Sequence, residues 1–74
     1  IKFSVPTDQD VTLRIYNVEG RLVRTLLQGR KVAGSHSVMW SGQNDQGARV
    51  ASGLYFYRLN TDSGTLTRKM TLLK

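Results

Sequence analysis

Apolar and polar residues alternate along much of this 74-residue chain, and a period of two predicts β-strands. The alternation is clearest in residues 1–5 and again in residues 11–16, where every second side chain is apolar. Such strands bury one face and leave the other in water. The positions predicted to face inward in these two segments are Ile1, Phe3, Val5, Val11, Leu13 and Ile15, and those predicted to face outward in the second are Thr12, Arg14 and Tyr16.

Turn-forming residues separate the predicted strands. Pro6 opens a polar turn over residues 6–10, and residues 17–20 predict a tight hairpin connection whose Gly20 can take positive φ. Residues 28–34 predict a basic loop interrupted by glycine, and residues 41–47 are rich enough in turn formers to reverse the chain.

Residues 21–27 fit either a strand or a helix. Val18, Leu22 and Leu26 are spaced four apart, as on one face of a helix. The segment is short, however, lies between Gly20 and Gly29, and has no capping residue after Gly20. We therefore predict a strand.

The last third of the chain predicts a hairpin, with strands at 54–60 and 66–73 around a turn at 61–64. We expect Tyr55, Tyr57 and Leu59 to face inward, which turns Leu54 and Phe56 outward beside Arg58. Residues 36–40 predict a further strand and residues 48–51 a short bridging one. Six to seven short strands with regular turn signals are typical of an all-β, immunoglobulin-like antiparallel β-sandwich.

Composition limits what such a domain can be. A core of this size rarely supplies more than about 3–5 kcal/mol, and without cysteine no disulfide or thiolate zinc site can add to it. Because Ile1 already lies in a predicted strand, we interpret residues 1–74 as one domain, a C-terminal fragment of a longer chain. No apolar run reaches the roughly 20 residues of a membrane span. The net charge of +6 favours anionic partners, although it also serves solubility.

Few side chains offer chemistry. His36 is the only histidine, and it shares a strand face with the apolar Val38 and Trp40, which indicates a structural strand residue. We therefore predict no catalytic residue and no enzyme. Asn44 and Asp45 are expected to close a turn on their own backbone. A weak calcium site there, completed by Asp8 or Asp10, is the alternative. No metal site and no cofactor is predicted.

Aromatic residues suggest two binding modes that must be weighed against burial. Tyr55, Phe56 and Tyr57 are adjacent, so their rings point to alternate faces and cannot form one stacking platform for nucleic acid. We predict no nucleic-acid partner. Trp40 is expected to anchor the core between the two sheets. A carbohydrate-binding module would instead expose Trp40 and Phe56 for stacking on sugar rings.

Several segments, taken in order, resemble one family. They are VTLRIYNVEG (11–20), LVRTL (22–26), AGSHSVMW (33–40), DQG (45–47) and SGLYFYRL (52–59). Their order and spacing are similar to the immunoglobulin-like domain first described in the flagellar hook-capping protein, which recurs at the C-termini of large secreted bacterial proteins. Residues 67–74, TRKMTLLK, resemble the tail of type IX secretion sorting domains. Ser41 departs from the aspartate that many members carry before the glycine.

The resemblance implies a non-catalytic C-terminal domain of an exported bacterial protein, secreted or held at the cell surface by way of the periplasm, that serves sorting or surface attachment. Its partner would be the secretion machinery or the preceding domain, with an anionic surface glycan as a further candidate. A structural or docking domain that stabilises a neighbouring enzyme or filament domain is the alternative, followed by the carbohydrate-binding module. The residues expected to bind the partner are Leu54, Phe56, Arg58, Arg68, Lys69 and Lys74.

Overall fold

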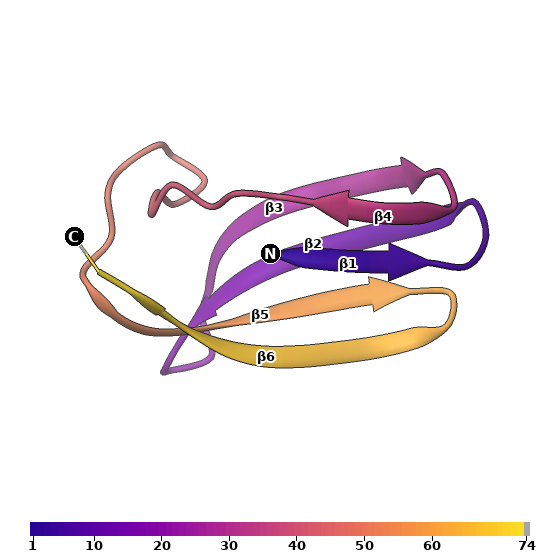
Figure 1. Ribbon diagram of the computed structural model, residues 1–74. Helices are drawn as coiled ribbons and strands as arrows, with labels where there is room; N and C mark the ends of the chain where they lie inside the picture. Colours follow the sequence, from indigo (N-terminus) through magenta and orange to yellow (C-terminus); the bar gives the residue numbers. More distant parts are fainter. Residues whose placement is uncertain (74) are drawn as a thin grey trace.

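The computed structural model describes residues 1–73, and six strands but no helix lie in this range (Figure 1). No helix long and apolar enough to cross a membrane therefore occurs in the described part. In chain order the strands are β1 (Lys2–Val5), β2 (Gln9–Asn17), β3 (Leu22–Lys31), β4 (Gly34–Ser37), β5 (Gly53–Thr61) and β6 (Gly64–Leu72).

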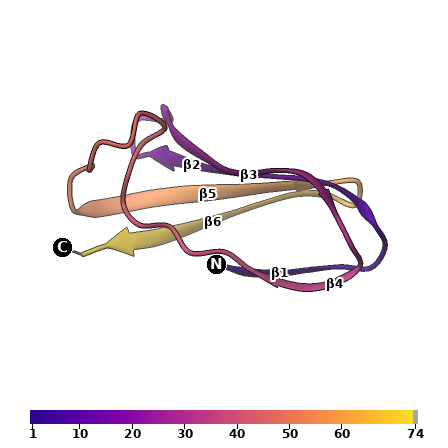
Figure 2. The same cartoon turned by 90° about the horizontal axis from the view of Figure 1, so that it is seen from above.

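The strands form two antiparallel sheets that face each other. Four strands lie in the order β3-β2-β5-β6, and β1 pairs with β4 as a separate ribbon. Figure 2 shows the β1–β4 ribbon as a second layer beside the four-stranded sheet. The C-terminal end of β6 twists toward this ribbon. The predicted all-β, immunoglobulin-like architecture is confirmed, with six strands.

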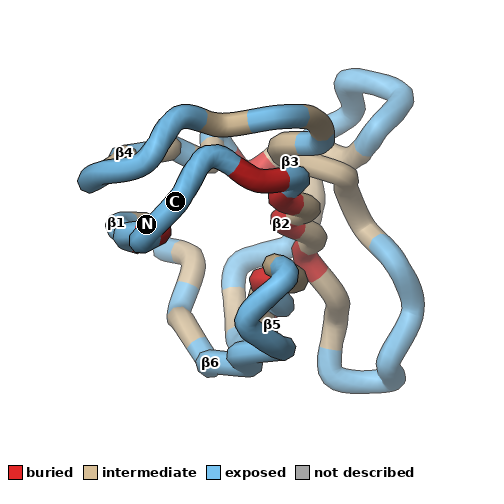
Figure 3. Tube along the Cα trace, turned by 90° about the vertical axis from the view of Figure 1, so that its right-hand side faces the viewer, coloured by how far each residue is buried: buried red, intermediate tan, exposed pale blue. Residues whose placement is uncertain are grey.

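The core fills the space between the two layers. Its buried positions are concentrated along β2, at the centre of the larger sheet (Figure 3). Leu13 and Ile15 are fully buried there, as the alternation predicts. On β5 the tyrosine face also points inward, since Tyr55 and Leu59 are buried and Tyr57 packs against the core. One face of the larger sheet is thus apolar and covered.

The β2–β3 hairpin turns where the sequence predicts it. The Asn17 side-chain oxygen accepts hydrogen bonds from the backbone N–H groups of Glu19 and Arg21, each at 3.0 Å. Gly20 takes a φ of +82°, which an L-residue with a side chain adopts at a cost. The ambiguous segment that follows is a strand, because pairing with β2 satisfies its backbone.

Several strand boundaries were wrongly predicted, among them the start of β2 at Gln9, inside the expected turn at 6–10. The expected loop at 28–34 is in fact strand up to Lys31, because β2 extends back to Gln9 and supplies partners for it. The strand expected over residues 36–40 ends at Ser37. Its one neighbour is β1, and beyond β1 only Ile1 and Val38 exchange backbone hydrogen bonds, at 2.8 Å each. The expected bridging strand at 48–51 is a single bridge between Gln43 and Arg49.

Trp40 does not anchor the centre of the core as predicted. It is half-buried at one end of the sandwich, edge-on to Tyr55 with ring centroids 5.1 Å apart. Its indole N–H donates to the Gln43 carbonyl at 2.9 Å. An indole needs such a partner when it is partly buried, and a turn at the sandwich end supplies one.

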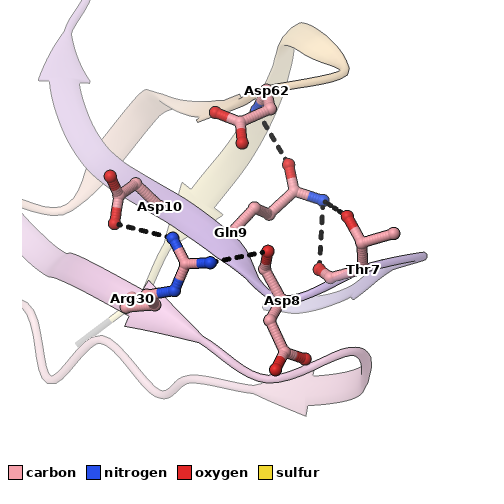
Figure 4. A network of polar contacts seen from close by, with 6 residues as sticks. All are labelled: Thr7, Asp8, Gln9, Asp10, Arg30 and Asp62. Carbon is pink, nitrogen blue, oxygen red and sulfur yellow. Dashed lines mark hydrogen bonds and ion pairs between the residues drawn. The ribbon is translucent and has the colours of Figure 1, made fainter.

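A buried amide fastens the opposite end of the sandwich (Figure 4). Gln9 is 1% exposed, and its Oε1 accepts a hydrogen bond from the Asp62 backbone N–H at 2.8 Å. Its Nε2 donates to the Thr7 carbonyl at 3.3 Å. Gln9 therefore joins the β1–β2 turn to the β5–β6 turn, two segments far apart in sequence. Sequence patterning predicted only a polar turn here.

Candidate docking site

Within residues 1–73 no second layer covers the outer face of the four-stranded sheet. Burial of the alternate β2 side chains on the inside turns Arg14 and Tyr16 outward. Residues directly opposite each other in an antiparallel pair share a face. The register therefore aligns Tyr16, Phe56 and Lys69 in one row across β2, β5 and β6.

These side chains form a cluster that we call the docking face. The Arg58 guanidinium lies 5.0 Å from the centre of the Tyr16 ring, in cation–π contact. A shallow hollow of about 210 Å³ lies beside this pair and is also lined by Phe56 and the β2–β3 turn. The docking face consists of Arg14, Tyr16, Leu54, Phe56, Arg58 and Lys69.

The docking face carries positive charge without local neutralisation. Arg14 lies directly opposite Arg58, a like-charge pairing that disfavours the isolated sheet. Within residues 1–73 the one ion pair joins Arg30 to Asp10 at 4.0 Å, so the cations of the docking face have no carboxylate at that distance there. A partner with acidic groups would remove this repulsion.

The structure brings together four of the six residues expected to bind a partner. Leu54, Phe56, Arg58 and Lys69 lie on the outer face. Arg68 is exposed but lies in the row opposite Tyr57, on the other face of β6. Lys74 lies outside the described residues.

Sequence reasoning missed two members of the docking face. It predicted that Arg14 and Tyr16 point outward but did not connect them with Phe56 and Arg58. That connection needs the pairing of β2 with β5, which are separated by β3 and β4 in the chain. The turn residues 17–20 predict the β2–β3 hairpin, but they do not predict that β2 also pairs with β5.

The Asn44–Asp45 loop closes turns, as the preferred interpretation predicted. The Asn44 side-chain oxygen accepts hydrogen bonds from the N–H groups of Gln46 and Ala48, each at 3.0 Å. An Asp45 carboxylate oxygen accepts from the Thr25 N–H at 3.0 Å. In the described residues no three acidic or histidine side chains are grouped as metal ligands would be.

His36 occupies the structural position that its alternation predicted. Its ring stacks on Phe3, with centroids 5.3 Å apart, and Nε2 is hydrogen-bonded to the Val32 carbonyl at 2.7 Å. Ser4 and Ser35 lie in the same ribbon, where their hydroxyl oxygens are 3.4 Å apart. A carbonyl oxygen can only accept, so Nε2 carries the proton of this hydrogen bond, which holds the ring in place on the ribbon.

The two facing antiparallel sheets define the class of immunoglobulin-like domains. Comparison with protein families then identifies the family. Residues 1–65 match the FlgD Ig-like domain, and the chain belongs to that family. Membership is consistent with the prediction that the chain is not an enzyme. No solved structure matches the chain significantly.

Curated relatives agree with the family match. The chain is 34% identical over 64 residues to the basal-body rod modification protein FlgD of Salmonella typhimurium and, equally, to that of Salmonella typhi. These matches cover 86% of this chain but only 27% of each relative. The predicted location, secreted or at the cell surface by way of the periplasm, is wrong: the relatives are named for the basal-body rod. Type IX sorting is not supported by either comparison.

Proposed function

We propose that this chain is a docking domain that holds its protein against another protein surface through the docking face. The domain would serve a protein of the rod-modifying type for which its Salmonella relatives are named. The single observation that carries the proposal is the contact of Arg58 with Tyr16 beside Phe56, on a sheet face that has no second layer.

The composition of the docking face supports protein binding. Aromatic residues and arginine are enriched where protein interfaces concentrate their binding energy, whereas lysine and acidic residues are depleted. Tyr16 and Phe56 supply apolar area with few rotatable bonds, so ordering them on binding costs little entropy. The cation–π contact already holds Arg58 in place, which lowers that cost further.

Charge indicates the kind of surface that would bind. Arg14, Arg58 and Lys69 surround the aromatic pair and need acidic groups opposite them. A folded protein surface with an apolar centre and an acidic rim meets both requirements. Trp40, by contrast, is half-buried, and its indole N–H is hydrogen-bonded within the chain, so it lacks the full exposure of a sugar-stacking ring.

The sorting role remains a separate prediction. It depends on the resemblance of residues 67–74 to sorting tails, and the family match ends at residue 65.

A graft tests the proposed function. This chain would replace the matched segment of the Salmonella typhimurium protein, and swimming in soft agar would report assembly of the flagellum. We expect the graft to support swimming and Arg58→Glu to abolish it, because loss of a central interface residue costs about 2 kcal/mol or roughly thirtyfold in affinity.

Arg49→Glu is the matched control, since Arg49 is exposed, is not a member of the docking face and carries the same charge. It should swim like the unmodified graft. Thermal unfolding of each isolated chain by circular dichroism would exclude misfolding. Normal swimming by a folded Arg58→Glu graft, or loss of swimming in the unmodified graft, would contradict the proposal.

A further inference from the structure

The two edges of the four-stranded sheet are protected differently. At the β3 edge, the Asn44–Asp45 turn lies against the strand: the Asp45 N–H donates to the Val23 carbonyl at 3.1 Å, and the Thr25 N–H donates to the Asp45 side chain at 3.0 Å. Arg24 adds a third hydrogen bond to the Asn44 carbonyl at 2.9 Å. No strand can pair with this part of β3 while the turn is in place.

The β6 edge has no such cover within the described residues, and Figure 1 draws β6 at the border of the sheet. Its nine residues pair with β5 without a register shift and contain no proline. The two-residue turn pairs Thr61 with Gly64, so Gly64 and every second residue after it direct their backbone groups toward β5. Thr65, Thr67, Lys69 and Thr71 direct theirs to the open edge.

We propose that the β6 edge binds an extended acidic segment of a partner protein, which adds to the sheet as a further strand. Backbone hydrogen bonds to the open edge would supply affinity, and side-chain contacts would supply selectivity. An unpaired strand edge of this length is normally blunted by a proline, a bulge or charge, and β6 has only charge.

That charge selects the segment. Arg68 and Lys69 are exposed, lie on opposite faces of β6, and have no carboxylate partner at ion-pair distance within residues 1–73. An added strand would therefore meet a cation on each face. A second copy of this chain would bring four cations onto one strand pair, which disfavours self-pairing. An acidic strand is favoured for the same reason.

A hollow beside β6 adds a second requirement. It has a volume of about 280 Å³ and lies between the C-terminal end of β6 and the β1–β4 ribbon. Met70 borders it and shares the inner face with Arg68, two positions away. A matching strand would place an acidic side chain opposite Arg68 and an apolar one over the hollow, again two positions apart. The residues lining the hollow include Ile1, Val38, Met39, Trp40, Met70 and Leu72.

Peptide binding to the complete chain tests this inference. The probe is a blocked peptide of about eight residues, threonine and valine throughout except for a glutamate and a leucine two positions apart. Binding would be measured by calorimetry and by amide hydrogen exchange. We expect exchange to slow at Thr65, Thr67 and Lys69, whose N–H groups face the open edge, more than at Leu66 and Arg68.

Variants separate backbone pairing from general charge attraction. Thr67→Pro removes an edge-facing N–H where proline is tolerated in folded sheets, and it should weaken binding about tenfold or more. Arg68→Glu should weaken binding of the glutamate peptide by about threefold or more. The same variant should bind a peptide with lysine in place of the glutamate more tightly than the glutamate peptide. Arg58→Glu, on the docking face, should leave the edge-facing amides protected on binding, so failure of the proposed function and of this inference can be told apart.

Three results would overturn the inference. One is the absence of saturable binding by the glutamate–leucine peptide. Another is equal affinity of a peptide N-methylated at every residue, since such a peptide has no N–H group to donate to the edge. The third is equal affinity of a peptide with glutamate and leucine adjacent, because adjacent residues point to opposite faces.

Discussion

Replacement of Gln9 by leucine should destabilise the domain although leucine is apolar and similar in size. Gln9 is 1% exposed, and its amide is hydrogen-bonded to the backbone of Asp62 at 2.8 Å and of Thr7 at 3.3 Å. Leucine offers no hydrogen bond, so both backbone groups lose their partner. A polar group left without a partner costs about 1–3 kcal/mol when buried, and less when water can reach it.

The lower end of that range applies here, because Thr7 and Asp62 are themselves exposed. Each backbone group that loses its partner should lower the free energy of unfolding by about 1 kcal/mol, and the added apolar contact should return a small part of this. Gln9→Leu should therefore lower the free energy of unfolding by about 1–2 kcal/mol. The core of a domain of this size supplies about 3–5 kcal/mol of stability in total, so the loss is a large part of the free energy of unfolding. The melting temperature should fall by about 5–15 °C.

Urea and thermal unfolding followed by circular dichroism would measure the effect. Gln28→Leu is the matched control, because Gln28 is exposed on β3 and the same substitution there should change stability by less than about 0.5 kcal/mol. A Gln9→Leu variant as stable as Gln28→Leu would refute the idea that the amide fastens this end of the sandwich.

Two further outcomes follow from the 41–47 turn. Gly42→Ala should destabilise the domain more than Gly47→Ala: both glycines have positive φ, at +77° and +85°, but only at Gly42 would a Cβ meet another side chain, Leu72 at 3.2 Å. Calorimetric melting of the two variants would compare them, and equal melting temperatures would count against the Leu72 contact. Asp45→Ala should speed amide exchange at Thr25, measured by NMR, because it removes the acceptor of that N–H; unchanged exchange would show that the turn does not hold the β3 edge.

Much of the fold could be predicted because β1, β2 and β5 each bury the side chains of one face and leave those of the other face more exposed. In β2 and β5 the alternation identifies the inward residues correctly, including Leu13 and Tyr55. The turn at Asn17 was readable because its side chain closes the turn locally. These are properties of neighbouring residues, which a sequence displays directly.

The predictions failed where the extent or order of a strand depends on pairing with a strand that is distant in the sequence. β3 continues to Lys31 despite its glycine and basic residues because Gln9 and its neighbours pair with it. β4 ends at Ser37 because the short β1 is its one neighbour. The docking face could not be assembled for the same reason, since Tyr16 and Phe56 become neighbours only through the pairing of β2 with β5. Alternation identifies faces, but it does not determine strand order.

The turn that covers Val23 and Thr25 also limits how far these domains could polymerise. A sheet with two open borders can recruit a neighbour on each side, and repetition of that step produces fibrils. Cover over Val23 and Thr25 hinders growth along that part of the β3 border, so edge-to-edge association of the four-stranded sheet is directed to β6.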